Sequence, residues 1–308
     1  MKRILKSALY RIPHVKNLND KNDSLKEELT QFKNNLFKLP GHYYSPVTSK
    51  DELRQREKQI WTEPEKFLSG IDLNENRQLE FLEEFATFYK DLEYTDEPKD
   101  GLRYYYNNNM YSYTDAIFLY GMIRSTKPKR IIEVGSGFSS AVMLDTNNAF
   151  FDNSIDLTFV EPYPDRLNSI LKENEQINLI EKFVQDVDLE TFRKLEAGDI
   201  LFIDSTHVSK TGSDVNFLFF NILPNLKKGV RVHIHDIFFP FEYPKSWAIE
   251  QGRSWNEDYL LRAFLTFNDK FKIVAFSTYL TIFHREWFEK NMPLCLKNTG
   301  GNIWLEVQ

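Results

Sequence analysis

The chain has 308 residues, of which 42% are hydrophobic and 15% are aromatic, enough for one sizeable core and a smaller appended region. Basic and acidic residues are interspersed along the chain, and the net charge is -6. No cluster of basic residues forms the positive surface that nucleic acids require, so we do not expect nucleic acid as the primary partner. The single cysteine, Cys295, permits neither an internal disulfide nor a cysteine-based zinc site, so we expect a cytoplasmic protein.

Residues 1–13 are basic and amphipathic but lack the apolar core of a secretory signal, so we expect this segment to be retained. No stretch of the sequence approaches the roughly 20 apolar residues that span a bilayer. The start of the chain is interpreted as a short solvated helix end, and the alternative is peripheral contact with a membrane surface.

A stripe of apolar residues with heptad spacing follows. Its members are Leu18, Leu25, Leu29, Phe32 and Leu36. Such a stripe serves either to pack a helix against the chain's own body or to form a homodimer through a short coiled coil. The pattern ends before residue 41, so residues 1–40 are predicted as an N-terminal helical or short coiled-coil segment.

Residues 41–110 are predicted as a helical accessory (cap) region, with apolar residues at helical spacing over 78–89. From about residue 111 to 308, short apolar runs alternate with helical patterns, which indicates crossover helices and a mostly parallel sheet. The predicted strands are 130–134, 157–160, 179–184, 200–203, 230–234, 272–276 and 303–307. We therefore expect an α/β, Rossmann-like, seven-stranded domain with helices on both faces of the sheet.

A glycine-containing loop, Gly135-Ser136-Gly137, follows the first predicted strand and precedes a helix. Glycines there allow a tight turn and close approach of a ligand, as in many nucleotide-binding folds. The third small position holds Ser139. Glu133 precedes the glycines, where its charge attracts the ammonium and sulfonium groups of S-adenosylmethionine and repels a pyrophosphate.

Two further acids follow the next predicted strands. Glu161 ends the second strand, where it can accept hydrogen bonds from both ribose hydroxyls. Asp186 follows the third, where it can accept one from an adenine amino group. Each acid alone is equally well explained as a helix cap or a solvated loop residue. Three acids at successive strand ends beside a glycine loop favour a cofactor site.

The segment Glu133-Val-Gly135-Ser-Gly137-Phe-Ser139 resembles the acidic-x-glycine-x-glycine motif of class I S-adenosylmethionine-dependent methyltransferases, with serine in place of the usual last glycine. The resemblance extends over about residues 110–308, and the closing residues 300–306 are similar to bacterial members grouped as methyltransferase family 24. It implies a seventh strand antiparallel beside the fifth and S-adenosylmethionine as cofactor. Tyr113 and Asp115 are expected to hold the methionine end of the cofactor.

Asp204 and Asp236 follow the fourth and fifth predicted strands, which the resemblance makes neighbours. Two adjacent carboxylates repel unless a cation or a proton lies between them. They also match the magnesium ligands of catechol-type O-methyltransferases, so a divalent metal such as magnesium is expected there. Ile237 replaces the asparagine of that pattern, and His207, His235 or Glu242 would have to complete the site.

Methyl transfer requires positioning of the acceptor and, for some acceptors, removal of its proton. His207 and His235 lie just beyond strand ends, so together with Asp204 they are the candidate catalytic residues, with His207 preferred as the base. The alternatives are a capping role for His207 and metal coordination by either histidine. His233 lies within a strand and is interpreted as structural.

Aromatic segments at residues 102–113 and 238–244 flank these positions and form either the acceptor pocket or packing for the accessory region. The favoured function is O-methylation of a small molecule or, by resemblance alone, of a glycan precursor. The alternatives are a nicotinamide-dependent oxidoreductase, which Glu133 disfavours, and a non-catalytic assembly module that retains the fold.

Overall fold

The computed structural model describes residues 13–173 and 175–308, and the chain divides into two compact units. The N-terminal unit comprises residues up to Ile60 together with Ala248–Ser254, and the sheet unit comprises Trp61–Trp247 and Trp255–Gln308. Residues 61–110 belong to the sheet unit. The division into residues 1–40, 41–110 and 111–308 that the sequence led us to expect stays a prediction.

The N-terminal unit is helical. Its helices are α2 (Pro13–Asn34), α3 (Lys50–Gln55) and α4 (Glu57–Ile60). Its second segment, Ala248–Ser254, contains most of a π-helical turn, Trp247–Gln251. Ser49 caps α3 by accepting a hydrogen bond from the Glu52 backbone N–H. No helix among residues 13–173 and 175–308 is long and apolar enough to cross a membrane.

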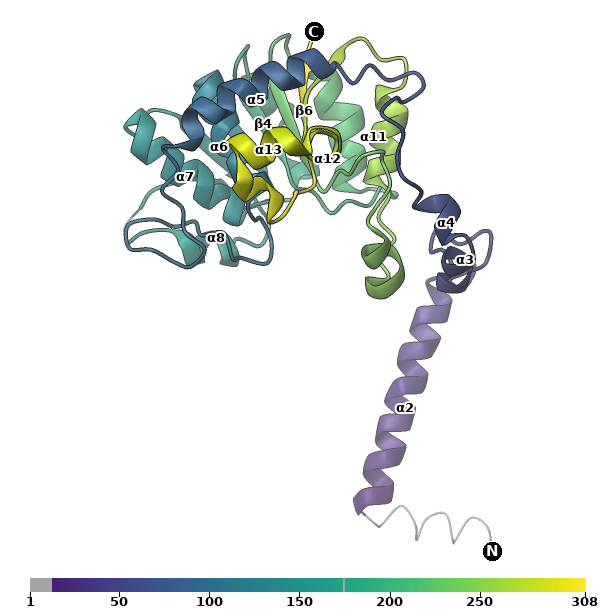
Figure 1. The fold of residues 1–308 in the computed structure, drawn as a ribbon. Helices are drawn as coiled ribbons and strands as arrows, with labels where there is room; N and C mark the ends of the chain where they lie inside the picture. Colours follow the sequence, from purple (N-terminus) through teal and green to yellow (C-terminus); the bar gives the residue numbers. More distant parts are fainter. Residues whose placement is uncertain (1–12, 174) are drawn as a thin grey trace, which may run out of the picture. The chain divides into compact units, whose positions relative to one another are not determined.

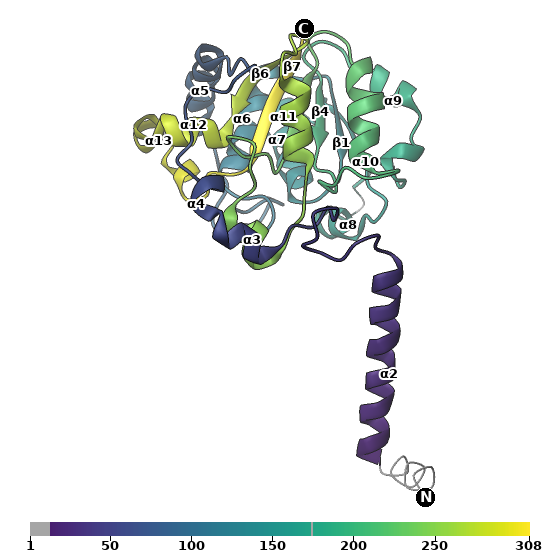
Figure 2. The ribbon, with the colours of Figure 1, turned by 90° about the vertical axis from the view of Figure 1, so that its right-hand side faces the viewer.

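The sheet unit contains a seven-stranded mixed sheet in the order β3-β2-β1-β4-β5-β7-β6 (Figures 1 and 2). Its strands are β1 (Arg130–Val134), β2 (Asp156–Val160), β3 (Asn178–Ile180), β4 (Ile200–Ile203), β5 (Arg231–His235), β6 (Phe271–Phe276) and β7 (Asn302–Val307). Strand β7 runs antiparallel to both β5 and β6, and the other pairs are parallel. The Rossmann-like seven-stranded fold, including the position of β7 beside β5, is confirmed.

Helices cover both faces of the sheet. Those with eight or more residues are α5 (Glu75–Tyr89), α6 (Thr114–Thr126), α7 (Phe138–Phe151) and α11 (Glu257–Leu265). The shorter ones are α8 (Asp165–Ile170), α9 (Leu189–Arg193), α10 (Asp214–Phe217), α12 (Ser277–Phe283) and α13 (Arg285–Asn291). In Figure 2, α11 lies in front of the strands, whereas α6 and α7 lie behind them.

Helix α6 lies at the centre of one helical layer, because it packs against both α5 and α7. It is buried continuously from Thr114 to Ile123, which is typical of an apolar helix enclosed on all sides. A Cβ atom added at Gly121 would lie 2.6 Å from the Phe85 ring. The glycine thus allows α5 to approach α6 closely.

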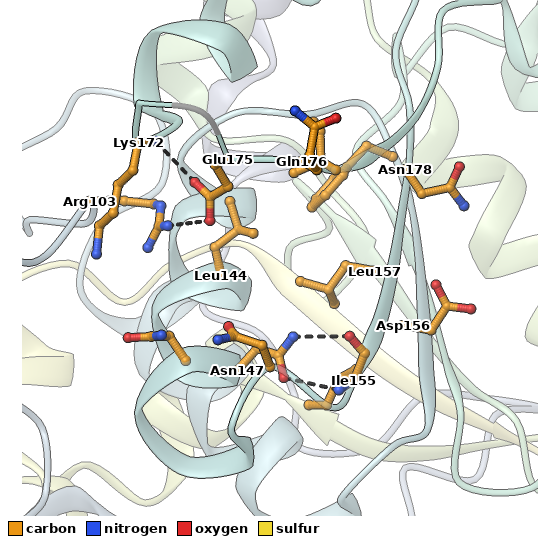
Figure 3. A pocket seen from close by; sticks show the side chains of 14 residues that line it. Arg103, Leu144, Asn147, Ile155, Asp156, Leu157, Lys172, Glu175, Gln176 and Asn178 are labelled. Atoms are coloured by element: carbon orange, nitrogen blue, oxygen red, sulfur yellow. Dashed lines mark hydrogen bonds and ion pairs between the residues drawn. The ribbon is translucent and has the colours of Figure 1, made fainter.

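A buried ion-pair network attaches the loop before α6 to α7, and Figure 3 shows its contact between Arg103 and Glu175. Arg103 Nη1 contacts Asp145 Oδ1 at 2.7 Å, and these two side chains are 5% and 2% exposed. Arg103 also binds Glu175. The second Asp145 oxygen accepts hydrogen bonds from the backbone N–H groups of Arg103 and Tyr104 at 2.8 and 3.0 Å. One arginine therefore holds three segments that are distant in the sequence.

Replacing this arginine by an apolar side chain should destabilise the sheet unit. Arg103→Met leaves the Asp145 carboxylate buried without its ion partner, which costs about 3–5 kcal/mol. Arg193→Met is the matched control, because its Glu190 pair is exposed and contributes less than about 1 kcal/mol. Urea unfolding of both variants measures the difference. Equal midpoints for the two variants would show that the network is not stabilising.

Candidate functional site

The glycine loop connects three strand ends at the carboxyl edge of the sheet. The Asp204 N–H donates to the Val134 carbonyl at 2.9 Å and joins the end of β4 to that of β1. The Ser136 N–H donates to Glu161 Oε2 at 3.0 Å and joins the loop to the end of β2. The structure thus brings Glu161 and Asp204 to the glycine loop, whereas no contact of Asp186 with the loop is seen among the described residues.

The backbone around position 135 requires a glycine even without a ligand. Its φ is +82°, in the left-handed region that glycine adopts without strain. A Cβ atom there would lie 2.0 Å from the Asp204 carbonyl oxygen. The atom that excludes a side chain is therefore a backbone oxygen of β4, whereas the sequence argument considered only the ligand.

Glu133 is fully buried and organises the loop. Its two carboxylate oxygens accept hydrogen bonds from the hydroxyls of Ser139, at 2.5 Å, and Ser140. The Ser140 oxygen in turn accepts the Gly137 N–H at 3.0 Å. Burial, with a smaller contribution from the Asp204 charge, raises the pKa of Glu133 to about 8. Its direct attraction of a cationic cofactor group stays a prediction.

Glu161 lies partly exposed at the end of β2. Besides the Ser136 contact, its Oε1 accepts the Tyr163 N–H at 2.9 Å. A carboxylate has about four acceptor positions, so the two contacts fix its orientation and leave acceptor capacity on both oxygens. This is the arrangement needed to receive a pair of hydroxyl donors.

The position predicted for adenine follows an exposed aromatic residue, Phe183, whose carbonyl accepts the Asp186 N–H at 2.9 Å. Asp186 is exposed at the end of the short helix η1 (Val184–Asp186). Tyr163 and Phe183 are 72% and 48% exposed, and their ring centroids lie 5.9 Å apart edge to face. Our sequence analysis missed both rings, although each follows the second or third predicted strand closely.

The residues predicted for the methionine end lie at the start of α6. The Tyr113 hydroxyl donates to Asp96 Oδ1 at 2.9 Å. Asp115 is buried, and its Oδ1 accepts the Gly301 N–H at 3.0 Å and the Asn302 amide at 2.6 Å. Both side chains thus have partners within the protein, and their contact with a cofactor stays a prediction.

His207 is the centre of a buried charge cluster. Its Nδ1 lies 2.9 Å from Glu257 Oε2, and its Nε2 lies 3.4 Å from Asp204 Oδ1 and 3.5 Å from Asp236 Oδ2. The imidazole ring also lies against Trp255, with centroids 4.3 Å apart. Sequence reasoning missed Glu257 because it is fifty residues away and only tertiary packing brings it here.

The backbone shares in this arrangement. The His207 carbonyl accepts the N–H groups of Asn256 and Glu257 at 3.1 and 3.2 Å, which fixes the start of α11. His207 and Asp236 both have positive φ, +61° and +55°. Such conformations are strained in non-glycine residues and cluster at functional sites, because surrounding contacts must hold them.

The electrostatics follow from this geometry. Burial alone would lower the pKa of His207, but Asp204 and Glu257 outweigh it and raise that pKa well above its usual value. Burial would raise the pKa of Asp204, yet His235 and His207 lower it. Burial raises the pKa of Asp236 despite the same two histidines. His207 is therefore an imidazolium at neutral pH, held between carboxylates.

A cavity of about 200 Å³ opens beside this cluster. It is lined by Asn108, Asn109, Met110, Ser112, Asp115, His235, Asp236, Phe238, Trp247, Asn298, Gly300 and Gly301. The Asp236 side chain is 17% exposed and that of His207 is 6% exposed. Asp236 thus faces the cavity, and His207 supports it from behind.

The two histidines of β5, His233 and His235, lie in different surroundings. His235 lines the cavity, with Nε2 3.6 Å from Asp236 Oδ1. His233 is fully buried and stacks on Phe202 at 4.0 Å. Burial lowers the pKa of His233 well below its usual value. It is a neutral residue of the sheet interior, as its position within the strand led us to expect.

The donor set does not support the expected divalent metal at Asp204 and Asp236. Among the described residues, no group of three or more His, Cys, Asp or Glu side chains is arranged to hold a metal ion. The imidazolium of His207 supplies the cation between the two carboxylates, and Glu242 accepts a hydrogen bond from Tyr259 at 2.6 Å. The described residues therefore do not supply the set of ligands that was predicted for magnesium.

A second cavity, of about 500 Å³, lies elsewhere in the sheet unit (Figure 3). Asp156 and Asn178, at the amino ends of β2 and β3, line it together with Arg103 and Glu175. Ligands of doubly wound sheets bind outside the carboxyl ends of the strands. The smaller cavity beside Asp236, at that edge, is therefore the candidate site.

Comparison with known proteins supports the cofactor interpretation. The model of a methyltransferase domain matches residues 132–237. An uncharacterised protein of Archaeoglobus fulgidus is 38% identical over 161 residues, which cover 51% of this chain and 73% of the archaeal protein. The match to the methyltransferase domain begins within β1 and ends two residues after β5, so it includes the glycine loop, Asp204, His207 and Asp236 but not Glu257.

Two solved methyltransferase structures are similar to this chain in fold, although their sequence identity to it is low. The SAH-bound methyltransferase PaMTH1 of Podospora anserina is 15% identical, with a TM-score of 0.42, over 88% of this chain and 98% of that one. The plantazolicin methyltransferase BpumL, with SAH and a triazolic desmethylPZN analog, is 13% identical, with a TM-score of 0.43, over 77% and 97%. Similarity this low does not indicate an acceptor for this chain.

The buried carboxyl at the loop makes a pH-dependent contribution to stability. Because folding raises the Glu133 pKa from 4.5 to about 8, the folded state binds the extra proton and loses stability as pH rises through this window. Glu133→Gln removes this loss, so its stability relative to the native protein should increase by up to about 1.4 kcal/mol per pH unit.

Urea unfolding at several pH values between about 5 and 8 measures this difference. Glu181→Gln is the control, because Glu181 is exposed and should show a flat difference over the same range. A difference for Glu133→Gln that does not vary with pH would mean that the carboxyl is already ionised in the folded protein.

Proposed function

Because the chain belongs to the class I S-adenosylmethionine-dependent methyltransferases, we propose that it methylates a hydroxyl oxygen of a small molecule or glycan precursor in the cavity beside Asp236. The observation that carries this proposal is the Asp236 carboxylate, which faces the cavity. The His207 imidazolium lies beside it, and Glu257 holds the other side of the His207 ring. Membership in this family removes the nicotinamide-dependent oxidoreductase alternative.

The carboxyl edge of β1 and β2 fits the cofactor. The turn at Gly135 brings the loop to the ends of β1, β2 and β4. Glu161 has free acceptor positions for the ribose hydroxyls, and Asp186 is exposed for the adenine amino group. The rings of Tyr163 and Phe183 offer apolar surfaces to the base. The bound cofactor supplies a methyl group already activated on a sulfonium sulfur.

Asp236 is the base in this proposal. Its carboxylate would accept the proton that the acceptor hydroxyl loses when its oxygen takes up the methyl group. Its raised pKa makes Asp236 a stronger base than an exposed aspartate. His207, which the sequence favoured as base, is already protonated and instead holds Asp236 in place by charge.

Supporting residues keep this pair in position. Glu257 binds Nδ1 of His207, the ring nitrogen that faces away from Asp236. Asp204 lies near Nε2 and helps to balance the positive charge of the ring. His235, the other histidine predicted to be catalytic, lies 3.6 Å from Asp236 and lines the cavity. These contacts orient the base before the acceptor enters, which is the main contribution expected of such an enzyme.

The cavity wall favours a compact polar acceptor. The Asn108 amide is engaged by the backbone of residues 105–111 and shapes the wall. The side-chain amides of Asn109 and Asn298 provide hydrogen-bond donors and acceptors, and Phe238 and Trp247 provide aromatic surface. This combination suits a ring with several hydroxyl groups, such as a sugar. The two aromatic segments thus contribute both to the pocket and to packing, since Tyr104, Tyr106 and Tyr111 are buried.

Removal of the ribose ligand should weaken cofactor binding. Glu161→Ala should reduce the affinity for S-adenosylmethionine by about 1–3 kcal/mol, because two hydrogen bonds to a carboxylate are lost. Calorimetric titration with the cofactor measures the change. Asp156→Ala, at the opposite end of β2, is the control and should bind as the unchanged protein does. Undiminished affinity of Glu161→Ala would remove Glu161 from the site.

The proposed base is tested by methyl transfer. Screening hydroxylated acceptors, including monosaccharides, nucleotide sugars and catechols, with methyl-labelled cofactor should identify a substrate without added metal. Asp236→Asn should then lower kcat by about 10²- to 10⁴-fold, while cofactor affinity stays unchanged. Asp269→Asn, an exposed acid at the protein surface, should keep full activity.

Full activity of Asp236→Asn would contradict the assignment of the base. Turnover only with amine acceptors would contradict the proposed hydroxyl acceptor. Intact cofactor binding without turnover on any acceptor would favour the third function considered, a non-catalytic assembly module.

A further inference from the structure

Helix α2 presents an apolar stripe to solvent. All its residues, Pro13–Asn34, are described and none is buried. Its large apolar side chains are exposed by about half: Leu18 56%, Leu25 54%, Leu29 50% and Phe32 48%. Leu36, which the sequence analysis included in the stripe, lies beyond the end of the helix. An aligned apolar row of this kind on one helix requires a partner.

The spacing of the apolar residues along the helix defines a heptad register. Positions a and d are occupied, in alternation, by Val15, Leu18, Asn22, Leu25, Leu29 and Phe32. Three consecutive a–d pairs therefore lie on one face, and the only polar residue among them is Asn22. We propose that a second copy of this chain covers the stripe, so that two α2 helices form a parallel coiled coil. This inference does not depend on the proposed activity.

Asn22 argues for an identical partner in parallel register. A single asparagine at an a position specifies register and oligomer state, because its amide hydrogen-bonds to the same residue of the other helix. In the antiparallel alignment that best overlaps the a and d positions, Asn22 would face Leu25 of the other helix. Its amide would then be buried without a partner, which costs stability.

Charges beside the stripe are compatible with this pairing. Glu28 at position g and Lys33 at position e carry opposite charges, and in a parallel dimer each pairs with the other residue of the second helix. Lys21 and Lys26 would meet as like charges. Lys26 already forms an ion pair with Asp23 of its own helix at 3.3 Å, which reduces that repulsion.

The same charges argue against a membrane surface as the partner. Helices that lie on anionic membranes carry an excess of Lys or Arg on their polar face. Helix α2 has four lysines and four acidic residues, so its net charge is zero. A membrane partner is therefore the alternative that the experiment must exclude.

The oligomeric state of the full chain tests the proposal. Sedimentation equilibrium at micromolar concentration should show a dimer, and the double variant Leu25→Lys, Leu29→Lys should be a monomer with unchanged affinity for S-adenosylmethionine. The double variant Gln31→Lys, Asn34→Lys, which adds the same charge outside the stripe, is the control and should remain dimeric. A monomeric unchanged protein, or a dimeric Leu25→Lys, Leu29→Lys variant, would overturn the proposal.

Cross-linking tests the parallel orientation. In a parallel dimer the two Leu18 positions face each other, so Leu18→Cys should form an intermolecular disulfide under mild oxidation. Asp20→Cys, on the outer face, should not, and the native Cys295 is buried. A dimer that Leu18→Cys fails to cross-link would contradict the parallel arrangement.

The membrane alternative is tested by flotation with phosphatidylserine vesicles. The unchanged chain should stay unbound. Binding that the double variant Leu25→Lys, Leu29→Lys abolishes would assign the stripe to a membrane and overturn the proposal.

Discussion

The contact between Gly135 and the Asp204 carbonyl determines how the site is built. A side chain at Gly135 cannot fit, because its Cβ would lie 2.0 Å from that oxygen. This contact places the turn after β1 directly against the end of β4, so the cofactor loop and the charge cluster share one edge of the sheet. The hydrogen bond from Ser136 to Glu161 then extends the same edge to β2.

A buried positive charge organises the acceptor side in a comparable way. Three carboxylates of β4, β5 and α11 would repel one another in a buried environment. The His207 imidazolium lies between them, and its backbone carbonyl also holds the start of α11. The same ring therefore fixes a helix, balances the charge and orients Asp236 toward the cavity.

The metal prediction failed for a reason that lies in this cluster. The sequence indicated that a cation or a proton lies between Asp204 and Asp236, and a resemblance to catechol-type enzymes suggested magnesium. Histidine supplies a cation equally well when carboxylates raise its pKa. Distinguishing the two requires the position of the ring, which depends on the +61° φ of His207 and on Glu257, fifty residues further along the chain.

The sequence by itself determined the order and approximate limits of the seven strands, because buried parallel strands form short apolar runs that contrast with their crossover helices. It also determined the glycine turn after the first strand and the acids Glu161 and Asp186 after the second and third strands, because the ends of strands can be located from the chain direction alone. The cofactor roles of these acids stay predictions. Only the tertiary structure decided that Glu133 is held by serine hydroxyls, that Glu257 supports His207, and that Asp236 faces the cavity. Those outcomes depend on the burial and direction of side chains from distant segments, which local periodicity does not encode.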